Sequence, residues 1–358
     1  MTTIAVCCGV GGVGKTTIAA ALALGQALQG KRVVVLTIDP ARRLADALGV
    51  PGLGNNPTPI ELGSLGAEGD VGRLDAVMLD RARTFDELVT RFSPSPENAE
   101  RLLGNPYYDA ARTRLTGAHE YLAIEKLYQL VEAKRWDLIV LDTPPSQHAV
   151  DFLRAPERIR KLFDGSVYTT LTEPGRGILG AAARRTIGLV ARVAGESTLA
   201  DATEFFRLLS GVAVALEERS RAVARVLHTD ACRFYLVTPP RASEADDVSS
   251  FVRALAEERL ALDALIVNRV VDRPAFTIAA ADIIAPDGWS EARYAPWRDA
   301  ITALPLEAED EHGRHRAAIG ALVAATGKQT PVWSVPEVPG GVRTLEGLAA
   351  LTPHLPTW

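Results

Sequence analysis

The chain has 358 residues, of which 47% are hydrophobic and 23% charged, and its formal net charge at pH 7 is −5. This composition is typical of a soluble globular protein, and the weak acidic balance argues against a nucleic-acid partner held by bulk positive charge. No apolar run approaches the roughly 20 residues that a membrane-spanning helix needs.

The N-terminus and the cysteines indicate the cellular compartment. The chain enters an apolar stretch almost at once, without a basic leader or a small-residue cleavage site, so we expect no signal peptide. Cys7, Cys8 and Cys232 are odd in number and lack framework spacing, which favours reduced thiols and a cytoplasmic location. Cys7 and Cys8 stand in an apolar run, and we expect them to fill the core.

Apolar, β-branched runs alternate with helical patterns along most of the chain. In chain order, the patterns predict a strand over 4–8, a helix over 15–28, a strand over 33–38, a loop over 49–72, strands over 74–79, 138–141, 234–237 and 262–267, a loop over 285–288 and a strand over 332–335. Such alternation predicts an α/β fold in which a mostly parallel sheet carries helices on both faces.

Two long regions interrupt this alternation. Residues 84–134 and 152–228 show helical spacing of apolar residues without a clear strand. We interpret them as insertions that form one helical subdomain. The predicted nucleotide-binding core comprises residues 1–84, 134–152 and 229–358, and the helical subdomain comprises 85–133 and 153–228.

The stretch VCCGVGGVGKTT, residues 6–17, fits two phosphate-binding patterns. Its glycines form the dinucleotide fingerprint G-x-G-x-x-G, and the same stretch forms the P-loop pattern G-x-x-x-x-G-K-[ST]. Without side chains, Gly11, Gly12 and Gly14 let successive N–H groups converge on phosphate oxygens. The residues after the loop decide between the two patterns.

Asp39 ends the second predicted strand, where a dinucleotide site needs an acid for a ribose hydroxyl. Three features nevertheless favour the P-loop. Lys15 directly follows the last glycine and can reach the β- and γ-phosphates, and Thr16 offers a hydroxyl to Mg²⁺. Asp142 ends the apolar strand in WDLIVLDTPP, where P-loop proteins place a carboxylate beside Mg²⁺. We therefore expect ATP or ADP with Mg²⁺, and keep a nicotinamide-dependent dehydrogenase as an alternative.

Three motifs together resemble the ArsA-type ATPases: GVGGVGKTT, TIDPARRLADALG and LDTPPSQHAVDFL. This family includes the anion-transporting ATPases of arsenical pumps and the ATPases that target tail-anchored membrane proteins, and it belongs to the P-loop group that contains MinD and ParA. LTGAHEYLAIEKL resembles a motif of the family's helical subdomain. LIVNRVV and VPEVPGGVRTLEGL resemble the segments that surround the adenine. An actinobacterial branch of the family is especially similar.

The resemblance implies roles for individual residues. Lys15 would bind phosphates, and Thr16 and Asp142 would form the Mg²⁺ shell. Asp39 would orient or activate the attacking water, although an acid at a strand end can also be a solvated or capping residue. Asn268 would contact adenine, or else cap its strand. The remaining nucleotide-binding residues implied by the motifs are Gly11, Gly12, Val13, Gly14, Thr17 and Pro336.

The chain departs from the family pattern at several positions. Val10 stands where the wider group usually has a lysine that reaches the partner subunit's phosphates, and Gln147 replaces a glycine in the second switch. The stretch DRPAFTIAAADIIAPDGW lacks the C-x-x-C pair through which related subunits share zinc, so we expect no zinc. For the same lack of spaced cysteines, arsenite transport is not expected. His119 and His148 are single histidines without metal-ligand spacing.

The resemblance implies a homodimer or a heterodimer with a related ATPase, and a hydrophobic or membrane-protein client. Residues 176–195 contain four arginines and no acid until position 196, with an apolar helical face that includes Leu179 and Ile187. This segment is either a client- or lipid-contacting helix, with peripheral membrane association, or an ordinary helix with a solvated basic face. Because Val10 lacks a charge, an alternative function is a regulatory subunit that hydrolyses ATP weakly alone.

Overall fold

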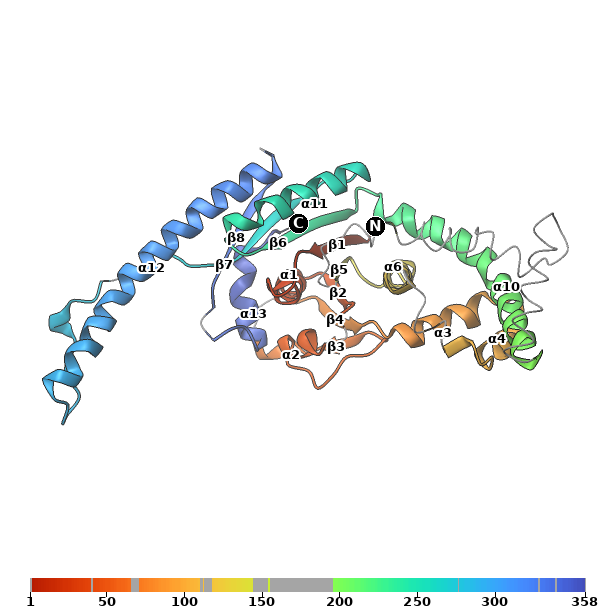
Figure 1. Cartoon of the computed structure of the whole chain (residues 1–358), viewed down its shortest axis with the longest axis horizontal. Helices are drawn as coiled ribbons and strands as arrows, with labels where there is room; N and C mark the ends of the chain where they lie inside the picture. The colour runs from red at the N-terminus through yellow and green to blue at the C-terminus, as the bar shows by residue number, and fades with distance from the viewer. Residues whose placement is uncertain are drawn as a thin grey trace.

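The computed structural model describes residues 2–39, 41–65, 71–109, 112, 118–143, 154, 196–275, 277–327, 329–338 and 340–357. Within them lies an eight-stranded sheet in the order β3-β4-β2-β5-β1-β6-β7-β8 (Figure 1). The strands are β1 (Thr3–Cys8), β2 (Arg32–Thr37), β3 (Thr58–Ile60), β4 (Arg73–Met78), β5 (Leu138–Asp142), β6 (Cys232–Thr238), β7 (Ala264–Val270) and β8 (Val332–Pro336). Every neighbouring pair is parallel except β3 with β4, which confirms the predicted mostly parallel sheet.

Helices connect the parallel strands. The helices of the described residues are α1 (Lys15–Leu28), α2 (Arg43–Ala47), α3 (Arg81–Phe92), α4 (Pro96–Leu103), α6 (Ala118–Glu132), α10 (Glu196–Leu227), α11 (Ala245–Glu257), α12 (Glu291–Thr326) and α13 (Leu345–Leu351). Short 3₁₀ turns are η1 (Gly63–Leu65), η2 (Ala242–Glu244), η3 (Ala280–Asp282) and η4 (Thr352–His354). Helix α1 has the bounds that the sequence pattern predicts.

Successive residues of a strand point to opposite faces of the sheet, and β1 shows this directly. Val6 belongs to a core that also contains buried residues of α3, α6, α10, α11 and α12. Ala5 and Cys7 belong to the other core, which contains residues of α1, α2 and α13. Helices therefore cover both faces, as predicted, and Cys7 and Cys8 are buried in the core, which confirms their expected packing role.

The sequence patterns identify seven of the eight strands, with ends that differ by up to three residues. The prediction of a continuous loop over 49–72 is wrong, because β3 pairs with β4 inside it. This strand has only three residues, and its Pro59 is tolerated because β3 lies at the edge of the sheet. Periodicity cannot reveal so short a strand.

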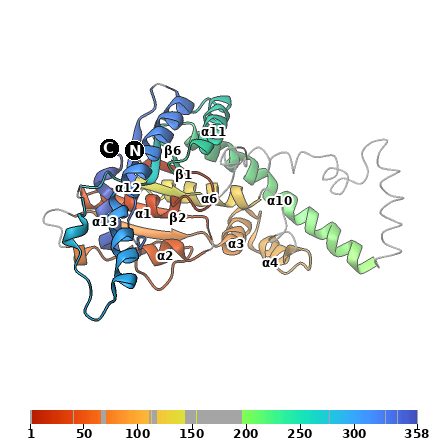
Figure 2. The same ribbon diagram turned by 60° about the vertical axis from the view of Figure 1, so that its left-hand side comes forward.

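Helices α3, α4, α6 and α10 contact one another on the side of the sheet opposite α1 (Figures 1 and 2). Arg219 of α10 is buried and bonds Glu125 and Glu132 of α6, with nearest N–O distances of 2.9 and 2.8 Å. A helical inserted region is thus present. The division between core and subdomain stays a prediction, and its first boundary, at residues 84 and 85, falls inside α3. Residues 155–195, which include the arginine-bearing segment, lie outside the described residues.

Candidate nucleotide site

The loop between β1 and α1 lies at the carboxyl ends of the central strands, where parallel α/β sheets bind ligands. Gly9, Gly12 and Gly14 have φ angles of 145°, 80° and 92°. A Cβ on Gly9 would lie 2.3 Å from the carbonyl oxygen of Val237, so β6 leaves no space there. A side chain on Gly14 would meet the amide of Asn268 at the same distance of 2.3 Å. Backbone angle and close packing together require glycine at both positions.

Asn268 fastens the phosphate loop to β7. Its Nδ2 donates a hydrogen bond of 2.8 Å to the carbonyl oxygen of Val13, and its side chain is buried. This amide group is therefore already engaged with the protein in the structure. The predicted contact of Asn268 with adenine is untested, and the structure adds a positioning role for this residue.

Lys15 begins α1 and curls back over its own loop. Its Nζ donates a hydrogen bond of 2.8 Å to the carbonyl oxygen of Val10. Burial lowers the pKa of Lys15, while the neighbouring carboxylate of Asp142 acts in the opposite direction. The side chain of Val10 is half-buried and packs against the apolar core that contains α1. Position 10 therefore contributes a main-chain acceptor for Lys15, and no cation.

Asp142, at the end of β5, connects this strand to β2 and to helix α1 at the floor of the site. Its Oδ2 accepts hydrogen bonds of 2.8 Å from the hydroxyls of both Thr16 and Thr37. Its other oxygen, Oδ1, is buried and has no hydrogen-bond partner among the described residues. Burial raises the pKa of Asp142 to about 6, against the lowering effect of the two hydroxyls and Lys15.

This arrangement fits a hard divalent cation. Mg²⁺ binds through one or two protein oxygens and keeps other positions for water and phosphate. The hydroxyl of Thr16 and the carboxylate of Asp142 provide such oxygens, and a cation would satisfy the unpartnered Oδ1. The donor set therefore agrees with the Mg²⁺ shell predicted from the sequence.

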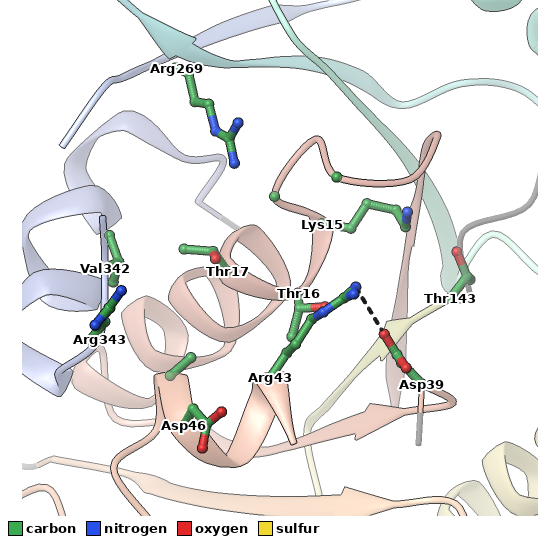
Figure 3. A pocket seen from close by; sticks show the side chains of 13 residues that line it. Lys15, Thr16, Thr17, Asp39, Arg43, Asp46, Thr143, Arg269, Val342 and Arg343 are labelled. Atoms are coloured by element: carbon green, nitrogen blue, oxygen red, sulfur yellow. Dashed lines mark hydrogen bonds and ion pairs between the residues drawn. The ribbon is translucent and has the colours of Figure 1, made fainter. Parts of the chain in front are cut away.

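Asp39 follows β2 and faces the same space (Figure 3). Its Oδ1 accepts a hydrogen bond of 2.9 Å from the N–H of Ala41, and its Oδ2 lies 3.2 Å from a guanidinium nitrogen of Arg43. The carboxylate is thus held by α2 beside the phosphate loop. The neighbouring Arg42 donates instead to the carbonyl oxygen of Pro51 and is not among the residues around the cavity.

These groups surround a cavity of about 330 Å³. Of the predicted residues, Gly12, Gly14, Lys15, Thr16, Thr17 and Asp39 line it; the other lining residues are Arg43, Asp46, Ala47, Thr143, Arg269, Val342 and Arg343 (Figure 3). Asp142 lies behind Thr16, and Gly11 is exposed in the loop. Val13 is buried. Pro336 ends β8 opposite Val270 and does not line this cavity.

Two arginines at the cavity are absent from the predicted site. Arg269 follows Asn268 in a bulge of β7, with a φ angle of 64° that is uncommon for a residue with a side chain. Arg343 follows Gly340 and Gly341, whose φ angles of 79° and 76° turn the chain toward the site. Their only signal in the sequence was a position within LIVNRVV and VPEVPGGVRTLEGL.

Gln147 and His148 lie outside the described residues, as do the other residues of the second switch after Thr143. Nothing is described of the side chain of His119. Among the described residues, no group of three or more His, Cys, Asp or Glu side chains is arranged to hold a metal ion. The absence of zinc stays a prediction. Within the same residues, no helix combines the length and apolar character needed to cross a bilayer.

The parallel sheet, the glycine loop with Lys15 and the Thr16–Asp142 contact define a P-loop nucleotide-binding protein. Comparison with known sequences identifies the family. Residues 2–278 match the profile of the anion-transporting ATPase family, and the chain belongs to this ArsA-type family. This membership excludes the dehydrogenase alternative.

Individual relatives agree with this placement. An uncharacterised protein of Streptomyces coelicolor is 29% identical over 358 residues, which cover 94% of this chain and 83% of that protein. A protein of Mycobacterium tuberculosis is 35% identical over 154 residues, or 41% of this chain and 36% of its own length. ATPase GET3C of Arabidopsis thaliana is 26% identical over 275 residues, covering 74% of this chain and 66% of that protein. The first two sources agree with the actinobacterial branch.

Proposed function

We propose that the chain binds ATP with Mg²⁺ and hydrolyses it, and that closure of two subunits controls a client protein or membrane partner. The observation that supports the binding of ATP with Mg²⁺ is the environment of the Asp142 carboxylate. One carboxylate oxygen holds the hydroxyls of Thr16 and Thr37, while the other is buried without a partner. Such a buried orphan oxygen is costly unless a ligand satisfies it.

The proposed roles follow from position. The ammonium of Lys15 would leave the Val10 carbonyl oxygen for phosphate oxygens, and the N–H groups of the glycine loop would bind the same anion. Thr16 and Asp142 would hold Mg²⁺, which when bound neutralises developing phosphate charge. Arg269 and Arg343 add cations at the other side of the cavity, where the rest of the nucleotide would lie.

The water-orienting role is assigned to Asp39. Its carboxylate lines the cavity near Lys15 and Thr16. The contact with Arg43 fixes one oxygen, and the Ala41 N–H fixes the other, so the group is oriented before substrate binds. A preoriented acceptor beside the phosphates suits the alignment of an attacking water.

The client part of the proposal depends on the family resemblance and on the placement of the helical region. Helices α3, α4, α6 and α10 form a unit beside the sheet, and α3 and α6 connect it to strands β4 and β5. Of these two helices, α3 follows the carboxyl end of β4, whereas α6 precedes the amino end of β5. Movement at the nucleotide edge of the sheet would therefore be transmitted to the helical unit through α3. The cytoplasmic location, dimerisation and the client remain proposals.

A second candidate function is a nucleotide-binding subunit that hydrolyses weakly alone and acts in a heterodimer with a lysine-bearing sister ATPase. The observation that favours it is Val10, whose half-buried aliphatic side chain offers no charge to a partner's phosphates. Turnover per chain, measured over a range of protein concentrations, separates the two functions. A homodimeric ATPase gains activity with concentration, whereas the regulatory subunit stays slow until the sister is added.

ATP binding itself is tested with Lys15→Ala. The loss of a buried cation from the phosphates should weaken Mg·ATP about 10- to 100-fold, since a hydrogen bond between charged groups contributes about 1.5–3 kcal/mol. Calorimetric titration measures this, with Lys31→Ala as the control. Lys31 bonds Gln26 at the far end of α1, so its loss should leave affinity unchanged. Equal affinity of wild type and Lys15→Ala would refute nucleotide binding at this loop.

A further inference from the structure

Residues 277–311 form an arm that extends from the sheet (Figures 1 and 2). The arm comprises the segment after β7, with η3, and the first 21 residues of α12. Only Pro305 of this part of the helix is buried, whereas the later residues Ala318 and Leu322 pack into the core. The first half of α12 thus lies in solvent, away from both faces of the sheet.

The arm is a built structure, although it buries little. The ring centroids of Trp289 and Trp297 lie 5.6 Å apart, and those of Tyr294 and Trp297 lie 6.2 Å apart. The hydroxyl of Tyr294 donates to the carbonyl oxygen of Ile283, which fastens the segment before the helix to the helix itself. Aromatic contacts of this kind are stabilising, so the arm presents its surface in a defined form.

The root of the arm is fixed to β7. The N–H of Val271 donates to Nδ1 of His315 at 3.0 Å, and Nδ1 of His312 lies 2.9 Å from the carbonyl oxygen of Val271. Arg273 pairs with Glu309 at 3.1 Å. The projecting part therefore begins from a firm base two residues from Arg269, which lines the nucleotide cavity.

The arm carries the exposed apolar surface of the described chain. The large apolar side chains that are exposed among the described residues are Ile284, Trp297, Leu304 and Leu306, at 85%, 38%, 55% and 71%, and all four lie on it. Trp297 and Leu304 are seven residues apart in α12 and so share one helix face. Four exposed apolar side chains of this size on one arm, two of them on the same helix face, indicate a docking surface.

The arm is also strongly acidic. Residues 277–311 contain eight acidic residues and two arginines, a net charge of −6, whereas the whole chain has −5. Both arginines are used within the arm: Arg293 lies over the ring of Trp289 at 4.2 Å, and Arg298 lies over that of Tyr294 at 5.4 Å and bonds Asp299. No cation of the described chain pairs with the exposed carboxylates Asp282, Asp287 and Glu307.

We propose that this arm docks a cationic amphipathic segment of another protein. Its apolar side chains would cover Trp297 and Leu304, and its lysines or arginines would meet the unpaired carboxylates. Charge complementarity selects this occupant. An anionic lipid surface would be repelled, and a second arm would bring like charges together. The inference does not depend on ATP hydrolysis.

The test uses the full-length chain and a synthetic amphipathic helix made of leucine and lysine, titrated by calorimetry. We expect micromolar binding that weakens as salt rises. The variant Ile284→Ser with Leu304→Ser should weaken it by about tenfold or more, as should Asp282→Asn with Asp287→Asn and Glu307→Gln. These side chains are exposed, so the variants should fold and bind ATP normally.

The matched control removes three exposed charges from the body through Glu61→Gln, Glu100→Gln and Glu218→Gln, and should leave peptide affinity unchanged. Equal weakening by this control would overturn the proposal, as would equal binding of a leucine–glutamate helix. Self-association of the wild type that the Ile284→Ser, Leu304→Ser variant abolishes would assign the arm to a second copy instead. Arm-dependent binding to phosphatidylglycerol vesicles would likewise overturn it.

Discussion

Lys15 donates a hydrogen bond of 2.8 Å to the main-chain carbonyl oxygen of Val10, five residues earlier in the same loop. Lys15 is thus held over the phosphate site by Val10, the residue that stands where the wider group usually has a lysine that reaches the partner subunit's phosphates. Because the contact uses the main chain, it does not depend on the side chain at position 10. The valine is therefore compatible with phosphate binding while it removes a cation that a partner subunit would receive.

This relationship leads to a prediction about turnover. We expect the isolated wild type to be slow and Val10→Lys to raise kcat about 10- to 100-fold, which is part of the roughly 10³–10⁵ in rate that a fully positioned cation contributes at a transferring phosphate. Val10→Met, which lengthens the side chain without charge, is the matched control. Steady-state phosphate release measures the effect.

The arginines after Asp39 provide an internal comparison. Arg43 contacts Asp39 at the cavity, whereas Arg42 bonds the Pro51 carbonyl oxygen. We therefore expect Arg43→Ala to lower kcat about tenfold, less than the roughly 10²–10³ that loss of a direct donor to the reacting group costs, and Arg42→Ala to change it little. The wild type could instead turn over fast, and the Arg42→Ala, Arg43→Ala double variant could keep that rate. This result would contradict the prediction that the site lacks a cation because position 10 is valine.

The second prediction concerns pH. Burial raises the pKa of Asp142 to about 6, so the carboxyl is mostly protonated below that pH. It must then lose its proton before it can bind Mg²⁺. Mg·ATP affinity should therefore be constant above about pH 7 and fall by up to about tenfold per pH unit below 6. Titrations from pH 5 to 8 measure it. Asp142→Asn gives the baseline of the nucleotide's own titration, and identical profiles for both proteins would refute the assignment.

Third, Asp142 should destabilise the nucleotide-free protein at neutral pH. Its folded-state pKa of about 6 exceeds the ordinary value of 3.8, so the folded state binds more protons between these values and stability falls as pH rises through them. Two units correspond to about 3 kcal/mol. Asp142→Asn should therefore melt higher than wild type at pH 7.5, with the gain lost near pH 4.

Asp137 offers a control of opposite sign. Hydrogen bonds from Arg32 lower the pKa of its carboxyl to about 2, so its stabilisation is present above about pH 4 and lost as pH falls toward 2. Asp137→Asn should accordingly melt lower than wild type at pH 7.5. A lower melting temperature for Asp142→Asn as well would show that the Thr16 and Thr37 contacts outweigh desolvation.

The fourth prediction tests the anchor beneath the phosphate loop. Asn268→Ala removes the hydrogen bond to the buried Val13 carbonyl oxygen, at a cost of about 1–3 kcal/mol, and should weaken ATP about tenfold by loosening the loop. Gly14→Ala should be more damaging, because its Cβ would lie 2.3 Å from the Asn268 amide.

The double variant separates packing from backbone strain. With Asn268→Ala the steric conflict disappears, so Gly14→Ala should then cost only the strain of a φ angle of 92°, about 1–2 kcal/mol. Thermal melts and ATP titrations of the four proteins in this cycle measure the coupling. Strictly additive effects would mean that the two residues do not interact.

The sequence by itself determined the sheet and the chemistry of the loop. Seven strands could be predicted because parallel strands buried on both faces read as continuous apolar runs. Lys15 and Thr16 could be assigned because their function depends on consecutive residues that close around a phosphate. Asp142 could be assigned because a carboxylate at the end of such a run lies at the ligand-binding edge.

Only the tertiary structure decided which distant groups meet this loop. Asn268, Arg269 and Arg343 are more than 250 residues from it in the chain, and they reach it because β6, β7 and β8 lie beside β1 with their carboxyl ends at one edge. Arg43 contacts Asp39 and Arg42 does not, because the orientation of α2 about its axis directs only Arg43 toward the cavity. The exposure of the arm depends on where α12 leaves the core. Local periodicity records none of these, since each is set by packing between segments far apart in the sequence.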